Sequence, residues 1–346
     1  MDIDTLKRRI QEHCTDGLVV VVGSGLSVAE GIPGMWSLAR HLLTALPTLL
    51  PSDSETVWAE IANDLENDID LETALLSHEA GQELESLIMT QTASFLLEHE
   101  RKVIEDVVVR GRMLRFSRLL SVLRKEPSGI PVITTNYDRL IEIAAEQAGV
   151  GIDSAFVGHR LGTFDAKRSR MSLCRDVSIV KNKRIRKEYC DHIRLLKPHG
   201  SFDWFSTNSG PIRCSLRIEG GQRLIITPGL NKYRSGYDPP FDYHIGESNR
   251  AIDKGSRFLI IGYGFNDDHL QTHITPRLKN GDPAVIITRS LSEKAKELLP
   301  ECSGTVAITK TATGDGTTVH THNSQHEFPD IDIWDVEHLV TEVWRQ

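Results

Sequence analysis

The chain has 346 residues, 39% of them hydrophobic, which is enough for one large folded domain or for a domain with an inserted module. Its formal net charge of −8 argues against a surface that binds nucleic acid over its whole extent. No apolar run approaches the roughly 18 residues that cross a bilayer, no signal-peptide core begins the chain, and the five cysteines lack paired spacing. We therefore expect a cytoplasmic protein without a membrane contact.

The first predicted strand, 19–23, runs into a glycine-rich turn. Four consecutive valines are typical of a strand that is buried on both faces. Gly23 and Gly25 would let the backbone turn sharply and approach a ligand, and the polar segment that follows would open a helix whose N–H groups attract a phosphate or pyrophosphate. Val28 stands where a Gly-x-Gly-x-x-Gly fingerprint needs its third glycine, which disfavours a redox dehydrogenase.

A helical module is predicted over 37–126, because apolar residues recur there at the spacing of amphipathic helices. Between Asp53 and Asp106, fifteen acidic residues are accompanied only by Arg101 and Lys102. We interpret these carboxylates first as a solvated face. Alternatively, the module is a surface that binds another subunit or a partner, or a lid over a ligand cleft.

Three later predicted strands, 131–135, 193–197 and 257–262, end in polar or glycine-rich segments. Further buried strands are expected at 223–227, 284–288 and 305–309. Alternation with helical or loop segments predicts a doubly wound, mostly parallel α/β sheet. Right-handed crossovers would then bring the residues after the strands to one cleft. These residues are Gly23, Asn136, His199 and Gly262.

The segment 160–190 is predicted to form an exposed basic loop or hairpin arm. Nine basic residues between Lys167 and Glu188 are accompanied only by Asp176 and Glu188. A contact with the acidic module of a neighbouring subunit is an alternative. A nucleic-acid contact is not favoured, because aromatic residues are not regularly interleaved.

The C-terminal segment 310–346 is predicted as a loop followed by a helix. Turn-forming residues from Lys310 to Pro329 indicate the loop, and 331–345 has the pattern of a closing amphipathic helix. His320, His322 and His326 lie in the loop, but no carboxylate or cysteine at a ligand spacing supports a metal site there.

Four of these motifs, in this order, resemble the NAD site of the sirtuins. Gly-Ser-Gly-Leu-Ser with the later Gly-Ile-Pro is similar to the sirtuin nucleotide loop. Thr134, Asn136 and Asp138 match the Thr-Gln-Asn-Ile-Asp motif position by position, and His199 precedes a glycine as the catalytic histidine of that family does. The glycine-rich turn at the end of the predicted strand 257–262 is similar to the sirtuin element that holds the adenosine side of NAD. The resemblance implies a Rossmann-like, sirtuin-like fold over 1–346, with the helical module inserted.

The chain also departs from the sirtuin pattern. It lacks the two Cys-x-x-Cys pairs of the deacylases, so no structural zinc is expected, and Gly34-Met35-Trp36 replaces the usual Phe-Arg. The resemblance is closest to the zinc-ribbon-lacking, NAD-hydrolysing proteins of prokaryotic anti-phage defence. It implies an NAD⁺ glycohydrolase that depletes NAD, forms a homo-oligomer and is regulated by assembly with a HerA-type ATPase.

The resemblance also assigns residue roles, with NAD as the substrate. Asn136 and His199 would be catalytic: Asn136 would position a ribose hydroxyl or the attacking water, and His199 would act as the general base. Asp138 would bind the nicotinamide carboxamide, and Asn266 with Asp267 the adenosine ribose. The remaining NAD-binding residues would be Gly23, Ser24, Gly25, Leu26, Ser27, Gly262, Tyr263 and Gly264.

Two other functions stay open. A protein deacylase or ADP-ribosyl transferase is disfavoured by the missing zinc ribbon, which shapes the peptide cleft of the deacylases. A non-catalytic regulator that binds NAD or ADP-ribose is disfavoured by the presence of both Asn136 and His199.

Overall fold

The structure is a computed structural model that describes residues 2–124, 126–180, 184–216, 218, 220–227 and 238–344. Lys181 and Lys183 of the basic run and Arg345 of the expected closing helix lie outside the described residues.

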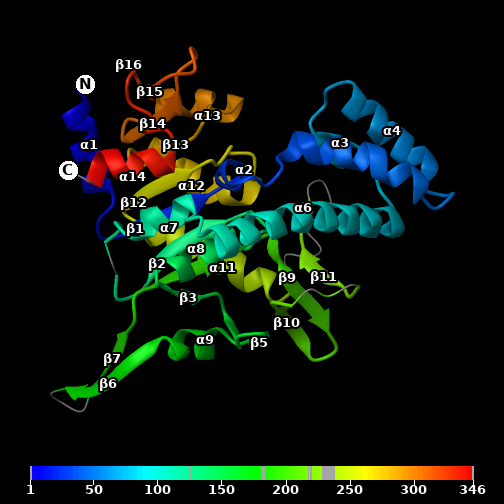
Figure 1. Ribbon diagram of the computed structural model, residues 1–346, viewed down its shortest axis with the longest axis horizontal. Coiled ribbons are helices and arrows are strands. Elements are labelled where there is room, and N and C mark those ends of the chain that lie inside the picture. The colour runs from blue at the N-terminus through cyan, green and yellow to red at the C-terminus, as the bar shows by residue number, and fades with distance from the viewer. Residues whose placement is uncertain are drawn as a thin grey trace.

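A large, mostly parallel sheet forms the centre of the fold (Figure 1). In the described part of the chain it has nine strands, in the order β16-β15-β14-β13-β12-β1-β2-β8-β3, and only β15 and β16 pair antiparallel with their neighbours. The strands are β1 (Leu18–Val22), β2 (Ile130–Thr134), β3 (Gly151–Asp153), β8 (His192–Leu196), β12 (Arg257–Ile261), β13 (Ala284–Ile287), β14 (Thr305–Lys310), β15 (Thr317–His320) and β16 (Gln325–Phe328).

Strand β1 is buried on both faces, as its run of valines predicts. Val20 and Val22 belong to one apolar cluster, and Val19 and Val21 to another, because successive side chains of a strand point to opposite faces. Helices cover both faces. One cluster includes residues of α1 (Ile3–His13), α7 (Arg115–Leu120), α8 (Leu140–Gln147) and α14 (Val336–Trp344), and the other residues of α11 (Phe241–Lys254), α12 (Asp268–Lys279) and α13 (Glu293–Leu298). The predicted doubly wound α/β sheet is confirmed.

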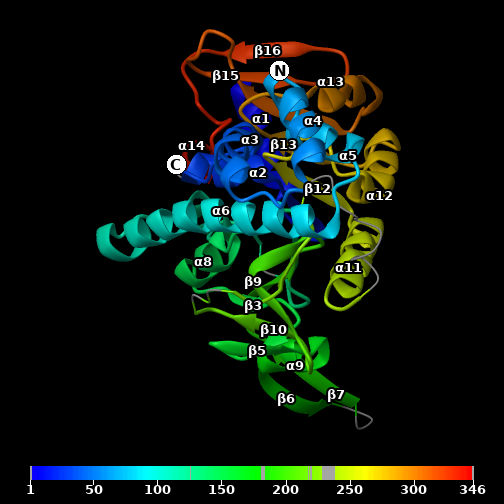
Figure 2. The ribbon, with the colours of Figure 1, turned by 90° about the vertical axis from the view of Figure 1, so that its right-hand side faces the viewer.

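The segment between the first two sheet strands is helical, as predicted. After the short α2 (Ser24–Glu30) come α3 (Met35–Ala45), the 3-10 helix η1 (Leu46–Thr48), α4 (Glu55–Glu66), α5 (Leu71–Ser77) and α6 (Gln82–Arg110). Leu42, Trp58 and Leu75 belong to a separate apolar core that these helices share. The long helix α6 runs out of this module and lies beside α8 and the strand β9 (Gly200–Thr207) (Figure 2).

A second sheet is antiparallel, with strand order β11-β9-β10-β5-β4. Its remaining strands are β4 (Phe156–Val157), β5 (Leu161–Phe164), β10 (Gly210–Cys214) and β11 (Arg223–Ile225). The strand expected at 223–227 is therefore present, but placing it in the parallel sheet was wrong. Strand β11 follows β10 closely along the chain and pairs antiparallel with β9.

Most of the basic segment forms a projecting arm. Helix α9 (Ala166–Ser172) leads into a hairpin of β6 (Cys174–Val180) and β7 (Arg184–Tyr189), which extends away from the main sheet in both views (Figures 1 and 2).

The prediction of a loop from Lys310 to Pro329 was wrong. The segment contains β15 and β16, which extend the main sheet beyond β14. Gly314 and Gly316 have positive φ angles of 98° and 91°, so the turn signals mark the connection of a hairpin. The closing helix α14 begins at Val336 rather than at 331. Within the described ranges, no helix combines the length and the apolar character needed to cross a membrane.

Candidate functional site

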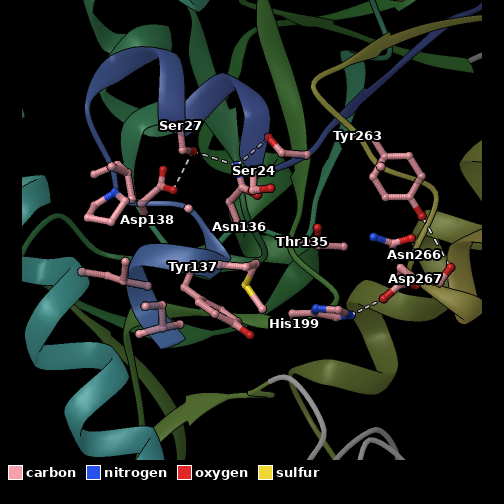
Figure 3. Close-up of a pocket in the computed structure, with 18 of the residues that line it drawn as sticks. Ser24, Ser27, Thr135, Asn136, Tyr137, Asp138, His199, Tyr263, Asn266 and Asp267 are labelled. Atoms are coloured by element: carbon pink, nitrogen blue, oxygen red, sulfur yellow. Dashed lines mark hydrogen bonds and ion pairs between the residues drawn. The ribbon is translucent and has the colours of Figure 1, made fainter. Parts of the chain in front are cut away.

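A hollow of about 210 Å³ opens where β1, β2, β8 and β12 end (Figure 3). The segments after these four strands all contribute to its wall, because the carboxyl ends of parallel strands meet at one edge of a sheet. The predicted site residues that line it are Gly23, Ser24, Ser27, Asn136, Asp138, His199, Tyr263, Gly264, Asn266 and Asp267.

Gly25, Leu26 and Gly262 do not line the hollow, because they pack backbone against backbone behind its wall. A Cβ on Gly25 would lie 2.7 Å from the Cα of Gly262, and one on Gly23 would lie 2.4 Å from its carbonyl oxygen. Gly262 has a φ of +57°. The close approach of these two turns explains why glycine stands at these positions, whereas the sequence suggested that a ligand approaches the backbone there.

Several backbone donors of this turn are already used within the fold. The N–H of Gly23 donates to Ile261 O at 2.9 Å, and the N–H of Gly25 donates to Gly262 O at 2.9 Å. Ser24 is the first residue of α2, where an amide has no acceptor within its own helix. Fewer backbone N–H groups are therefore available to bind a phosphate at this turn than the expected run from Gly23 to Leu26 would supply.

One wall of the hollow carries a short hydrogen-bond chain. Asn136 Nδ2 donates to Ser27 Oγ at 2.8 Å and to Gly23 O at 3.0 Å, and Ser27 Oγ donates to Asp138 Oδ2 at 2.7 Å. Burial raises the pKa of Asp138, while the Lys197 cation and the Ser27 hydroxyl act in the opposite direction. Ser27 thus connects the turn after β1 to the polar residues after β2.

His199 forms a close pair with Asp267 on the other side of the hollow (Figure 3). Their Nε2 and Oδ2 atoms are 2.6 Å apart, and the two side chains are only 14% and 6% exposed. Asp267 Oδ1 also accepts from the N–H of Leu270 at 2.8 Å and caps α12. The structure therefore places Asp267 against the histidine, and its expected contact with the adenosine ribose stays a prediction.

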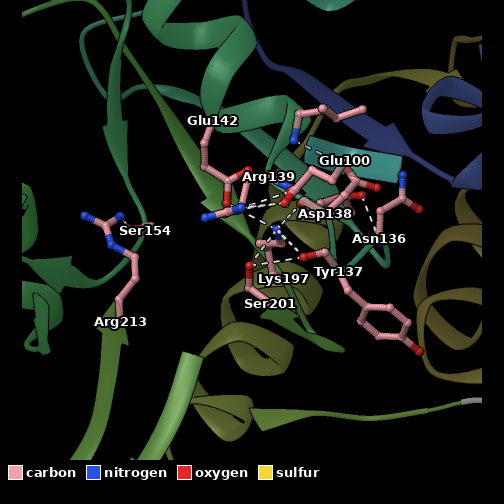
Figure 4. Close-up of polar contacts among 12 residues, drawn as sticks. Glu100, Asn136, Tyr137, Asp138, Arg139, Glu142, Ser154, Lys197, Ser201 and Arg213 are labelled. Atoms are coloured by element: carbon pink, nitrogen blue, oxygen red, sulfur yellow. Dashed lines mark hydrogen bonds and ion pairs between the residues drawn. The ribbon is translucent and has the colours of Figure 1, made fainter. Parts of the chain in front are cut away.

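A buried lysine, Lys197, connects the two sides of the site (Figure 4). Its side chain is 1% exposed, and Nζ donates to Asp138 O at 2.5 Å, to Ser201 Oγ at 3.0 Å and to Glu142 Oε1 at 3.1 Å. It holds the polar segment after β2 against the turn that carries His199. Sequence reasoning missed this role, although a single lysine at the end of an apolar strand was a signal for it.

The helical module is anchored to the site by Glu100 of α6 (Figure 4). Glu100 is fully buried and accepts from the backbone N–H of Arg139 at 2.6 Å and from its Nη2 at 2.5 Å. Arg139 directly follows Asp138, so this pair fixes the site segment from outside. Nothing in the sequence distinguished Glu100 from the other acidic residues of the module.

The module also forms part of the wall of the hollow. Met35 and Leu38 of α3 and Glu72 of α5 line it, together with the residues 32–34 that precede α3. The module therefore covers the strand edge, which is the arrangement that a lid requires.

In the described part of the chain, no group of three or more His, Cys, Asp or Glu side chains is arranged to hold a metal ion. All five cysteines are free thiols. They are Cys14, Cys174, Cys190, Cys214 and Cys302.

Part of the chain matches the model of a known protein family. Residues 131–302 match the family model described as the SIR2-like domain. The match begins in β2, ends shortly after α13, and includes Asn136, Asp138 and His199. Strand β1, helix α2 and the helical module precede it. No curated protein matches the chain.

Solved structures of Sir2 proteins are similar at low sequence identity. A mutant Sir2 homologue in complex with 2'-O-acetyl ADP ribose is 14% identical, with 99% of this chain and 95% of that chain covered and a TM-score of 0.43. A Sir2 homologue in complex with NAD is 13% identical, with coverages of 99% and 92% and a TM-score of 0.39. Sir2 bound to an acetylated peptide is 12% identical, with coverages of 86% and 90% and a TM-score of 0.35.

Proposed function

We propose that the chain is an NAD⁺ glycohydrolase that cleaves the bond between nicotinamide and ribose and releases nicotinamide and ADP-ribose. The observation that carries the proposal is the His199–Asp267 pair, which faces Asn136 and Asp138 across one hollow at the carboxyl edge of the sheet. The match of residues 131–302 to the SIR2-like domain supports NAD as the ligand.

The His199–Asp267 pair has the arrangement of a general base and its orienting group. In the neutral tautomer with its proton on Nε2, the nitrogen beside Asp267, the other ring nitrogen, Nδ1, has the lone pair that accepts a proton. In the proposed reaction the oxygen of water forms a bond to the ribose carbon, the bond to nicotinamide breaks with its electron pair, and His199 takes the proton of the water. Asp267 stabilises the imidazolium that results.

Asn136 and Asp138 would hold the nicotinamide riboside half of the substrate. Nδ2 of Asn136 is engaged by Ser27 and Gly23, so its Oδ1 would accept from a ribose hydroxyl or from the attacking water. Asp138, as a carboxylate, would accept from the carboxamide N–H₂ of nicotinamide. The cationic ring of the substrate would lower the pKa of this buried carboxyl group again by direct attraction.

The size of the hollow suggests how binding proceeds. Sites for small molecules are usually about 300–1,000 Å³, and this hollow of about 210 Å³ is smaller. We propose that the helical module moves outward to admit the dinucleotide and closes over the nicotinamide half. Closure would then exclude water other than the attacking molecule.

We further propose the biological setting that the sequence resemblance suggests. The chain would deplete cytoplasmic NAD during phage infection, and its resting activity would be restrained by assembly with itself and with a HerA-type ATPase. Unrestrained loss of NAD would harm the host cell, so we expect the resting activity to be restrained. Co-purification of the tagged chain from its own host, with and without infection, tests the partner.

Turnover of NAD by the purified chain, with chromatographic identification of the products, tests the reaction. We expect nicotinamide and ADP-ribose in equal amounts without an added peptide. NAD use that depends on an acetylated peptide would instead support a deacylase. NAD binding without turnover, both alone and with the co-purified partner, would support the regulator.

A further inference from the structure

The arm hairpin carries an apolar face that is exposed to solvent. The register of β6 and β7 pairs Val177 with Lys187 and Ile179 with Ile185. Paired residues share a face and alternate residues lie on the same side of a strand, so these four residues form one face of the ribbon. Val177, Ile179 and Ile185 are 55%, 78% and 65% exposed. We call this surface the arm face.

An exposed ribbon of this kind needs a partner. An isolated two-stranded hairpin is at best marginally stable in water, and additional strands or a packed helix are usually needed to stabilise it. In both views the hairpin projects from the body of the molecule, so its own chain supplies little cover (Figures 1 and 2). Contiguous exposed apolar side chains on a soluble protein typically mark an interaction surface.

The charges near the arm face indicate the kind of partner. In the arm, cations outnumber the acidic Asp176 and Glu188. The cations whose side chains the structure describes are Lys167, Arg168, Arg170, Arg175, Arg186 and Lys187. A partner with both apolar and acidic groups on its surface would complement the aliphatic side chains of the arm face and the cations of the arm.

The helical module offers such a surface where α4 joins α5. Glu66, Asp68 and Asp70 are exposed there, and Ile69 and Leu76 are apolar side chains with 38% and 62% exposure. We call these five residues the acidic corner. Its charge is opposite to that of the arm, and its exposed apolar groups match those of the arm face.

We propose that the arm face of one chain docks on the acidic corner of a second copy of the same chain. Burial of the three aliphatic side chains would supply the contact energy, and the charges would set the orientation and the rate of encounter. A nucleic acid would leave these aliphatic groups without a partner, since it is bound chiefly through its phosphates and by stacking on aromatic groups. This proposal does not depend on the reaction at the candidate site.

Sedimentation velocity of the full chain over a concentration series tests the proposal. We expect self-association that weakens between about 0.1 M and about 1 M salt, where the Debye length falls from about 10 Å to about 3 Å. Ile179→Ser and Lys187→Glu should each weaken the association constant by about tenfold or more.

Two matched controls separate docking from general attraction. Arg186→Glu makes the same change of charge on the opposite face of the hairpin, and Val109→Ser removes an apolar side chain of α6 that is 75% exposed. Both should associate nearly as the wild type does, and all variants should keep its thermal midpoint. Mixing Lys187→Glu with Glu66→Lys chains should restore association between the two.

A monomer at every concentration would overturn the proposal, as would equal losses in Lys187→Glu and Arg186→Glu. Binding of a labelled oligonucleotide that both charge reversals abolish and Ile179→Ser leaves intact would assign the arm to nucleic acid instead. Failure of the mixed pair to associate, when the single variants are folded, would exclude the acidic corner as the docking surface.

Discussion

Removal of either partner of the buried Glu100–Arg139 pair should destabilise the protein, and removal of the arginine should cost more. Glu100 is fully buried, while 23% of the Arg139 side chain reaches solvent. Arg139→Leu therefore leaves a carboxylate with no access to water, whereas Glu100→Leu leaves a guanidinium that water can still reach.

The structure sets the magnitudes. Breaking a buried ion pair by removing one partner typically costs about 3–5 kcal/mol, and we expect Arg139→Leu near the upper end of this range. Glu100→Leu loses the same ion pair and leaves the backbone N–H of Arg139 without its acceptor, but solvation of the guanidinium reduces the cost to about 2–3 kcal/mol. The double Leu variant contains neither charge, so it should be more stable than Arg139→Leu alone.

Urea denaturation of the wild type, the two single variants and the double variant measures these differences as a double-mutant cycle. If the changes in the free energy of unfolding of the two single variants sum to that of the double variant within about 0.5 kcal/mol, the reasoning is refuted, because such changes are additive for independent sites and not for a buried pair. Single variants within about 1 kcal/mol of the wild type would show that the pair is not buried as described.

Three further predictions concern the site and its surroundings. Asp267→Asn keeps the helix cap but no longer stabilises the imidazolium, so kcat for NAD cleavage should fall by about 10²–10⁴-fold with little change in KM, in steady-state kinetics. Gly262→Ala places a Cβ 2.6 Å from Leu26 N at a φ of +57°, so it should lower the free energy of unfolding, measured by urea denaturation, by about 2–4 kcal/mol. The control Gly246→Ala lies in α11 with nothing within 4 Å of the added Cβ, so it should raise that free energy by about 0.5–1 kcal/mol. Equal effects of the two changes would contradict the packing argument. Burial lowers the pKa of His244 from 6.5 to about 3, so its contribution to stability is complete above pH 6.5 and is lost as the pH falls toward 3. His244→Asn should therefore reduce the loss of stability between pH 7 and pH 5 by about 2 kcal/mol, and an unchanged loss would contradict the lowered pKa.

Much of the fold could be predicted because the buried strands are short runs of β-branched residues bounded by turns. Each of the seven expected strands is present, and β1, β12 and β13 differ from prediction by a residue or so at their ends. The prediction failed where polar strands lie at a sheet edge. In β16, the exposed Gln325 and Glu327 alternate with the partly buried His326 and Phe328. This strand pairs with β15 alone, and no apolar run marks it in the sequence.

The candidate site was predictable only in the parts that follow strands. Asn136, Asp138 and His199 come directly after strand ends, and the sheet brings them together. Lys197 and Glu100 act through partners distant in sequence. The lysine at the end of an apolar strand was a signal that the prediction missed, whereas nothing distinguished Glu100 from the other acidic residues of its module. Gly262 illustrates a third case, in which the residue was singled out for a ligand and is explained by backbone packing.

The central claim is that His199 is the base of an NAD-cleaving site, and nicotinamide release at saturating NAD by His199→Ala tests it most directly. The matched control is His273→Ala, because His273 also pairs with a carboxylate, Asp253, at 2.8 Å but does not line the hollow. We predict that His199→Ala lowers the rate by about 10²–10⁴-fold while NAD binding, measured by calorimetry, persists and the control keeps wild-type turnover. Equal rates for His199→Ala and the wild type would contradict the account.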